Sequence, residues 1–240
     1  MTAHPVFGYG THTGYRRSHN EDSYLAAPEL GLWLVADGMG GYEGGEVASA
    51  IVIEQVGETV AQGGSIMQAL QDAHVAVLAA PEHDRGQAGM GSTAVCLLLQ
   101  GAEYEIAWVG DSRAYLWNGQ TLTQLTHDHS LVQQYIDRGE ISEKEAEVHP
   151  QRHVISQAIG SARNGGIQVD SICGELSLGE SILLCSDGLT EDVPLDELQS
   201  VLSKNKAVQV TSDLLIAAAL EHGGSDNVTV IIVSASIDCA

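Results

Sequence analysis

Four aspartates in this 240-residue chain stand where an apolar run meets glycine or serine. The runs are LWLVADG, IAWVGDS, ILLCSDG and SDNVTVIIV, and the acids are Asp37, Asp111, Asp187 and Asp226. A fifth acid, Asp22, follows RSHNE at the start of a further run. A single aspartate beside a strand commonly opens a turn or caps a helix. Five of them predict a shared rim of carboxylates, provided that the strands converge.

Carboxylates gathered at one rim repel one another, which raises their pKa values and lowers the stability of the fold. Divalent cations remove that repulsion. A ligand set made of oxygen atoms, without His or Cys, favours Mg²⁺ or Mn²⁺ over zinc. The pattern therefore favours a dinuclear metal site, whose cations could in turn hold a phosphate.

Other phosphate and acyl chemistries fail on spacing. A cysteine phosphatase needs an arginine six residues after its nucleophile, and none stands there after Cys96, Cys173 or Cys185. No G-x-S-x-G elbow and no Gly-Lys pair of a P-loop occurs. The three cysteines lie in apolar runs, so we expect them to be small buried residues.

The elements that position the acids follow from periodicity. Alternating or apolar runs predict strands near 5–11, 22–27, 31–36, 91–99, 104–109, 113–117, 167–174, 180–186 and 227–237. Apolar stripes predict two helices after the first glycine-rich loop, with Ser65 as the N-cap of the second, and a later pair at 194–203 and 206–221. The polar stretch 128–147 is expected to be helical within a surface excursion. Strands with inserted helix pairs favour stacked antiparallel sheets flanked by helices.

Composition narrows the class of partner. Ten Lys and Arg face 32 Asp and Glu, which gives a formal charge of -22. Such a surface repels nucleic acid and anionic bilayers, so we expect neither as a partner. No leader pattern and no apolar run of about 18 residues is visible, which favours a cytoplasmic protein.

Eight motifs occur in order over nearly the whole chain. They are RSHNEDS at 17–23, VADGMGGYEGGEVAS at 35–49, GMGSTAV at 89–95, VGDSRAY at 109–115, LTHDHS at 125–130, HPQRHVISQAIG at 149–160, LLCSDGLTE at 183–191 and GGSDNVTVI at 223–231. Together they resemble the metal-dependent protein phosphatase family, the type-2C Ser/Thr phosphatases in their bacterial form. The resemblance implies an α+β fold, a four-layer αββα sandwich of two antiparallel β-sheets flanked by helix pairs. It also implies one catalytic domain over residues 1–240, with a flap at about 131–165.

The resemblance further implies a site and its metal ions. Asp37 would bridge two Mn²⁺ or Mg²⁺ ions, and the carbonyl of Gly38 would bind one of them. Further ligands would be Asp22, Asp187 and Asp226, with Glu21 supporting them from behind. Asp111, together with Asp187, would hold a weaker third ion. Arg17 would bind the substrate phosphate.

The implied reaction is hydrolysis of phosphoserine and phosphothreonine in proteins by a water or hydroxide that bridges the two ions. Tyr42 stands where bacterial relatives usually carry His, and a tyrosine with a pKa of about 10 is a weaker acid near neutral pH. Tyr42 and His153, the latter in the flap, are candidate substrate contacts. We expect a monomer that opposes a bacterial Ser/Thr kinase. Two alternatives stay open, a non-catalytic metal-binding module and a hydrolase of small phosphate esters.

Overall fold

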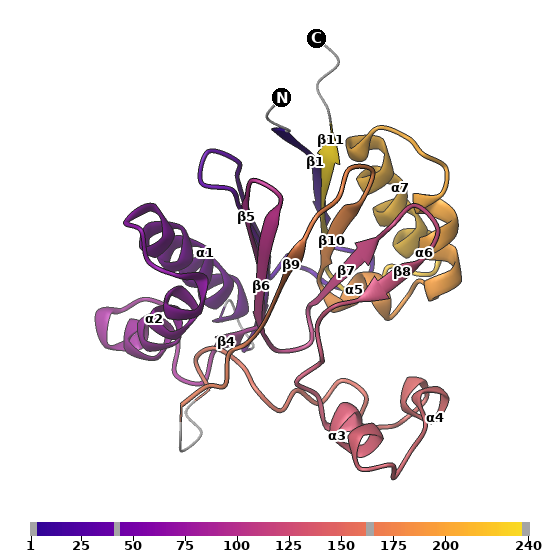
Figure 1. The fold of residues 1–240 in the computed structure, drawn as a ribbon. Helices are drawn as coiled ribbons and strands as arrows, with labels where there is room; N and C mark the ends of the chain where they lie inside the picture. Colours follow the sequence, from indigo (N-terminus) through magenta and orange to yellow (C-terminus); the bar gives the residue numbers. More distant parts are fainter. Residues whose placement is uncertain (1–3, 41–43, 162–165, 237–240) are drawn as a thin grey trace.

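Two antiparallel sheets form the centre of the molecule (Figure 1). The computed structural model describes residues 4–40, 44–161 and 166–236. One sheet has the order β1 (His4–His12), β11 (Val228–Ser236), β10 (Ser181–Cys185), β7 (Arg113–Trp117) and β8 (Leu122–Gln124). The other has the order β2 (Asp22–Ala27), β3 (Leu32–Met39), β5 (Ala94–Gln100), β6 (Glu103–Val109) and β9 (Asp170–Glu175), and β4 (Gly91–Ser92) pairs with β3.

The central strands are apolar throughout because both of their faces are buried. Successive side chains of a strand point to opposite faces. In β3, Trp33 and Val35 pack between the two sheets, whereas Leu32 and Leu34 pack under the helices of the outer layer. Strands β10 and β11 alternate in the same way on the other side. Burial on two faces fixes the register, because a shift by one residue would exchange the two sets.

Helices cover the outer face of each sheet. α1 (Gly44–Ala61) and α2 (Ile66–Ala79), followed by the 3-10 turn η1 (Ala80–His83), pack on β3 and β5. α5 (Asp187–Thr190), α6 (Leu195–Leu202) and α7 (Val208–Glu221) cover the other sheet. The predicted αββα layers are thus confirmed, and so is the N-cap Ser65, whose hydroxyl accepts from the Gln68 amide at 3.2 Å. None of the helices in the described ranges is long and apolar enough to cross a membrane.

The excursion differs from its prediction. Instead of one helical stretch over 128–147 it holds α3 (Leu131–Asp137) and α4 (Glu143–Glu147), which Figure 1 shows beyond one end of the sheets. The chain restarts at Ser142, which caps α4 by exchanging hydrogen bonds with Glu145.

Three details of the strands also differ. The strand predicted over 91–99 is interrupted at Thr93, because the Asp37 amide donates to the Thr93 hydroxyl at 3.1 Å instead of to its carbonyl. Strand β8 was not predicted. Cys173 is exposed, not buried, because β9 is an edge strand, whereas Cys96 and Cys185 are buried as expected.

The contact between the sheets makes a quantitative prediction. Ile182 is fully buried there, so Ile182→Ala should lower the free energy of unfolding by about 2–5 kcal/mol. Leu178→Ala is the matched control, since Leu178 is 61% exposed, and should change it by no more than about 0.5 kcal/mol. Urea unfolding measures both. Equal effects would contradict the packing described here.

Candidate metal centre

The predicted acids lie at one end of the sandwich, next to α5. Asp22 and Asp37 are directly opposite each other in the register of β2 and β3. Asp111 follows the end of β6, Asp187 follows the end of β10, and Asp226 precedes β11. The end of β6 pairs with the start of β5, and the start of β7 pairs with the end of β10. The strand ends next to the acids therefore lie at one edge of the two sheets. The convergence on which the sequence argument depended is therefore present.

Asp22 joins the two sheets. Its Oδ2 accepts hydrogen bonds from the hydroxyl of Ser186, the residue directly after β10, at 2.8 Å and from the hydroxyl of Thr229, in β11, at 2.6 Å. Its Oδ1 is buried and has no hydrogen-bond partner among the described residues. Burial raises the pKa of Asp22 from its ordinary 3.8 to about 7, the two hydroxyls oppose the shift, and Asp187 and Asp226 add to it.

The pKa values of the other buried acids are raised as well. Burial raises the pKa of Asp37 well above its usual range, and the negative charges of Asp22 and Asp187 raise it further. Burial and the charge of Asp187 likewise raise the pKa of Asp111. For Asp187, burial comes first and Asp226 second, whereas a direct contact with Asp37 opposes the rise. These groups therefore lack the positive charge that would let them all ionise.

The acids suit divalent cations because several of their carboxylate oxygens form no hydrogen bond among the described residues and could bind a metal ion. Besides Asp22, Asp111 and Asp187 each have a buried Oδ1 that finds no hydrogen-bond partner within the described part of the chain. Oxygen atoms of this kind are the ligands that Mg²⁺ and Mn²⁺ prefer. Within the described ranges, no three His, Cys, Asp or Glu side chains are grouped closely enough to form a complete metal site.

Gly38 is packed too closely for any side chain. A Cβ there would lie 2.0 Å from the carbonyl oxygen of Gly45 and 2.7 Å from that of Glu21. The Gly38 amide donates to the Glu21 carbonyl at 3.1 Å. Glu21 is held in turn by the Asn227 side chain, which accepts from its amide at 2.7 Å. Glu21 thus supports the loop through its backbone, directly behind Asp37.

Arg17 lies beside the last acid of the set. Its guanidinium donates to Asp226 at 2.5 Å, and the side chain is 51% exposed. The hydrogen bond to Asp226 is the main reason that the pKa of Arg17 is raised, and Glu21 and Asp37 contribute through their charge. Arg17 therefore lies at the exposed side of the acidic cluster, and its remaining N–H groups can donate hydrogen bonds to a ligand.

A second cation, Arg113, which sequence reasoning missed, also lies near the acids. Arg113 donates to both oxygens of Asp128, at 2.6 to 3.0 Å, and to the Tyr115 hydroxyl at 3.2 Å. Its charge lowers the pKa of Asp111 and Asp187, against the larger effects that raise them. The motif VGDSRAY contains Arg113 and was its only signal, because the partner Asp128 is 15 residues away.

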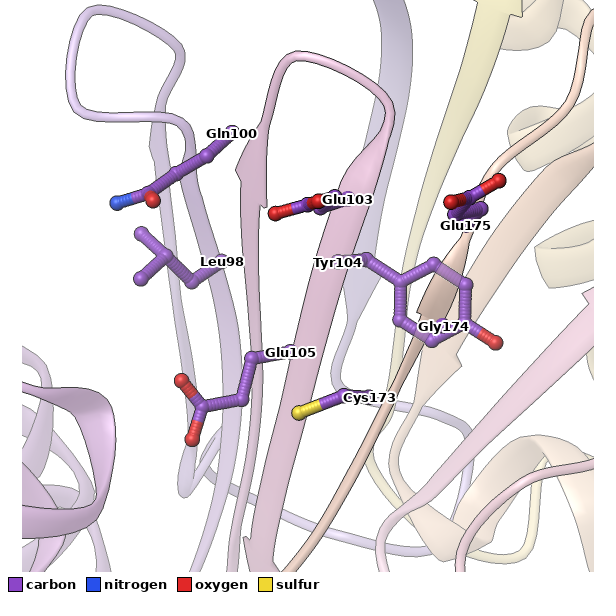
Figure 2. Close-up of a pocket in the computed structure, with 8 residues that line it drawn as sticks. All are labelled: Leu98, Gln100, Glu103, Tyr104, Glu105, Cys173, Gly174 and Glu175. Atoms are coloured by element: carbon purple, nitrogen blue, oxygen red, sulfur yellow. The ribbon is translucent and has the colours of Figure 1, made fainter.

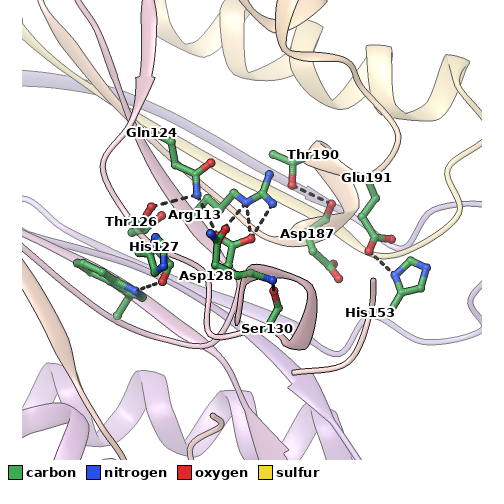
Figure 3. A network of polar contacts seen from close by, with 12 residues as sticks. Arg113, Gln124, Thr126, His127, Asp128, Ser130, His153, Asp187, Thr190 and Glu191 are labelled. Carbon is green, nitrogen blue, oxygen red and sulfur yellow. Dashed lines mark hydrogen bonds and ion pairs between the residues drawn. The ribbon is translucent and has the colours of Figure 1, made fainter. Parts of the chain in front are cut away.

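His153 contacts Glu191, a residue that the sequence did not single out. The Nδ1 of His153 is hydrogen-bonded to the Glu191 carboxylate. Figure 3 shows this pair on one side of Asp187 and the pair of Arg113 and Asp128 on the other. Burial raises the pKa of Glu191 to about 7, and the charge of Asp187 adds to the shift. The flap is thereby tied to the helix that begins at Asp187, whereas Tyr42 lies outside the described residues.

A separate hollow of about 430 Å³ lies over β5, β6 and β9, at the end of β6 that is away from Asp111. Figure 2 shows Glu103, Glu105 and Cys173 among the side chains that line it. Glu103 begins β6, whereas Asp111 follows its end, so the hollow and the acidic cluster are at opposite ends of one strand. Its carboxylates make it unsuited to bind a phosphate group.

Comparison with known proteins identifies the family. A family model described as protein phosphatase 2C matches residues 9–219. The serine/threonine phosphatase stp of Listeria monocytogenes is 33% identical over 238 residues, which are 94% of each chain. The serine/threonine protein phosphatase PstP of Mycobacterium tuberculosis is 36% identical over 225 residues, which are 91% of this chain and 43% of PstP.

Solved structures agree with these relatives. The crystal structure of the M. tuberculosis phosphatase PstP/Ppp matches with a TM-score of 0.89 and 33% identity, over 97% of this chain and 99% of that one. The catalytic domain of PstP in complex with two manganese ions matches with a TM-score of 0.84 and 33% identity, over 96% and 97%. This chain belongs to the protein phosphatase 2C family, as its motifs predicted.

The raised pKa values predict how the metal-free protein responds to pH. The folded pKa of Asp22 is about 7, against an ordinary 3.8, so between these values the folded state binds more protons than the unfolded state. Stability therefore rises as pH falls from 7.5 to 5.5, on the order of 1 kcal/mol or more. Thermal unfolding in chelator should show a midpoint higher by about 2–4 °C at the lower pH.

Two variants test the cause. Asp22→Asn can still accept from Ser186 and Thr229 but cannot ionise, so its midpoint should depend less on pH. Asp213→Asn, on an exposed position of α7, should retain the full dependence. A wild-type midpoint that falls between pH 7.5 and 5.5 would show that the acidic cluster does not control stability.

Proposed function

We propose that this chain is an active phosphatase that hydrolyses phosphoserine and phosphothreonine in proteins, with two bound Mn²⁺ or Mg²⁺ ions. The observation that supports it most is the set of buried carboxylates with unpaired oxygens at one end of a protein phosphatase 2C fold. Asp37 and the carbonyl of Gly38 would be ligands to these ions. The remaining proposed ligands are Asp22, Asp187 and Asp226, with Asp111 and Asp187 at a weaker third ion.

Each proposed ligand is already restrained by the fold. Asp37 is fixed by its amide and carbonyl to Thr93, at 3.1 Å and 2.8 Å. Asp22 is restrained by one oxygen and keeps the other free. When bound, the ions supply a water of lowered pKa as nucleophile and offset charge on the phosphoryl oxygens. Rigid ligands matter because a site that must reorganise on binding loses affinity and rate.

Arg17 is proposed to orient the phosphate. One nitrogen of its planar guanidinium is committed to Asp226, and the other donors can bind two phosphoryl oxygens. Asp226 thus aims Arg17 while serving as a ligand. On the leaving-group side we place His153, which Glu191 orients through Nδ1, and Tyr42. Both are proposed contacts of the phosphoprotein, and Tyr42 is the residue whose acidity differs from histidine.

We further propose a monomeric, cytoplasmic enzyme that works as one catalytic domain and opposes a Ser/Thr kinase. The phosphatase names of its relatives support phosphorylated proteins as substrates. The manganese ions in the related PstP structure support Mn²⁺ as the metal. The net charge of -22 supports the exclusion of nucleic acid and anionic membranes as partners.

The test is manganese-dependent turnover of a phosphothreonine peptide and of an aryl phosphate. Chelator should abolish both activities. Asp37→Asn should lower kcat by at least about 100-fold, because mutating a residue that only supports a metal ligand already lowers activity by up to about 100-fold. Glu103→Gln is the matched control, because it removes an acid at the opposite end of β6, and should leave both rates unchanged.

The other outcomes separate the alternatives. Turnover of the aryl phosphate without the phosphopeptide would support a hydrolase of small esters. Manganese binding without any turnover would support a non-catalytic module. Activity that survives chelator, or survives in Asp37→Asn, would contradict the proposed chemistry.

A further inference from the structure

The flap returns to the body of the protein at a buried histidine. After α4 the chain runs back to β4, where Ile159 and Ser92 exchange backbone hydrogen bonds at 2.8 Å and 3.0 Å. The next amide, that of Gly160, donates to the Nδ1 of His74 at 3.0 Å. His74 belongs to α2, which is 86 residues away along the chain. The end of the described part of the flap, residues 131–161, is therefore fixed to a helix of the outer layer.

His74 is an unusual residue for its position. It is 8% exposed and stands on the buried side of α2, next to Ala73 and one turn from Leu70 and Val77. Apolar residues are the common occupants of such a face. Burial lowers the pKa of His74, so the ring stays neutral and Nδ1 remains an acceptor. Within the described ranges, the side chain of His74 forms one hydrogen bond, which it accepts from the Gly160 amide.

Gly160 fits this position for two reasons of its own. Its φ of +82° is one that L side chains rarely adopt. A Cβ would also lie 2.4 Å from a methyl of Val77 and 2.8 Å from the carbonyl oxygen of Met90. The contact is therefore specific from both sides, with an acceptor on α2 and a residue without a side chain on the flap.

The contact acts on the flap more than on the metal ligands. Ser92 is held independently of Ile159, because it pairs with Gly38 in the register of β3 and β4 and its hydroxyl donates to the Asp37 carbonyl at 3.0 Å. Loss of the His74 bond would thus leave Asp37 in place. The flap itself reaches the acidic cluster through His153 and Glu191, so its orientation decides what a substrate meets beyond its phosphate.

We infer that His74 is a positioning residue for protein substrates, which orients residues 131–161 of the flap by accepting the Gly160 amide. This inference rests on the proposed function. Because His153 of the flap contacts Glu191 beside Asp187 (Figure 3), a phosphoprotein bound at the carboxylates would extend onto the flap, whereas a small aryl phosphate would not. His74 therefore contributes to recognition of the protein around the phosphate, without touching the phosphate.

The experiment compares His74→Leu, which removes the acceptor, with His74→Asn, whose side-chain oxygen stands near the place of Nδ1. With manganese, His74→Leu should raise KM for phosphorylated casein roughly 5-fold or more, with kcat for p-nitrophenyl phosphate within about 2-fold of wild type. His74→Asn should restore most of the affinity for casein.

Amide hydrogen exchange measures the hydrogen bond between Gly160 and His74 in the absence of any substrate. Protection of the Gly160 amide should fall at least about 10-fold in His74→Leu and recover in His74→Asn. Unchanged protection, or casein and aryl phosphate activities that fall in the same proportion, would overturn the inference. A wild-type chain that is inactive on both substrates would refute the proposed function instead, and the exchange result would still decide whether His74 fixes Gly160.

Discussion

Repulsion between buried carboxylates is the constraint on which the rest of the structure depends. Asp22, Asp37, Asp111 and Asp187 occupy one end of the sandwich, and burial together with their mutual charge raises the pKa of each. A flexible loop would relieve this repulsion by moving apart. Here the acids are attached to strands whose two faces are both buried, so the fold holds them together and leaves divalent cations as the natural counter-charge.

The contact between the two sheets holds the acids in place, and two arginines near the acids offset part of their charge. Asp22 accepts hydrogen bonds from the hydroxyls of Ser186, directly after β10, and Thr229, in β11, so the same contact joins the two sheets and orients its other oxygen. Arg17 and Arg113 both lie close enough to the acids to affect their charge, but each is paired with one carboxylate. They moderate the negative potential without cancelling it. A phosphate group, itself negative, is therefore expected to bind through metal ions and Arg17 instead of through the acids.

The sequence predicted the rim and the layers because both follow from local patterns. Apolar runs that end in Asp37, Asp111 and Asp187 locate the acids, and a strand buried on two faces needs such a run. What could not be predicted are contacts between segments far apart in the chain, such as His153 with Glu191, 38 residues apart, and His74 with Gly160. Cys173 was misplaced for a related reason, since nothing in its own run shows that β9 is an edge strand.

The most direct measurement is the number of protons released when the metal binds. If burial, reinforced by the charge of neighbouring acids, keeps the cluster partly protonated, with a pKa of about 7 for Asp22, Mn²⁺ must displace those protons when it binds. Calorimetric titration at pH 6.5 in two buffers of different ionisation enthalpy should then show release of about one proton or more per chain. Identical binding enthalpies in the two buffers, which mean no proton release, would contradict a cluster held together against its own charge.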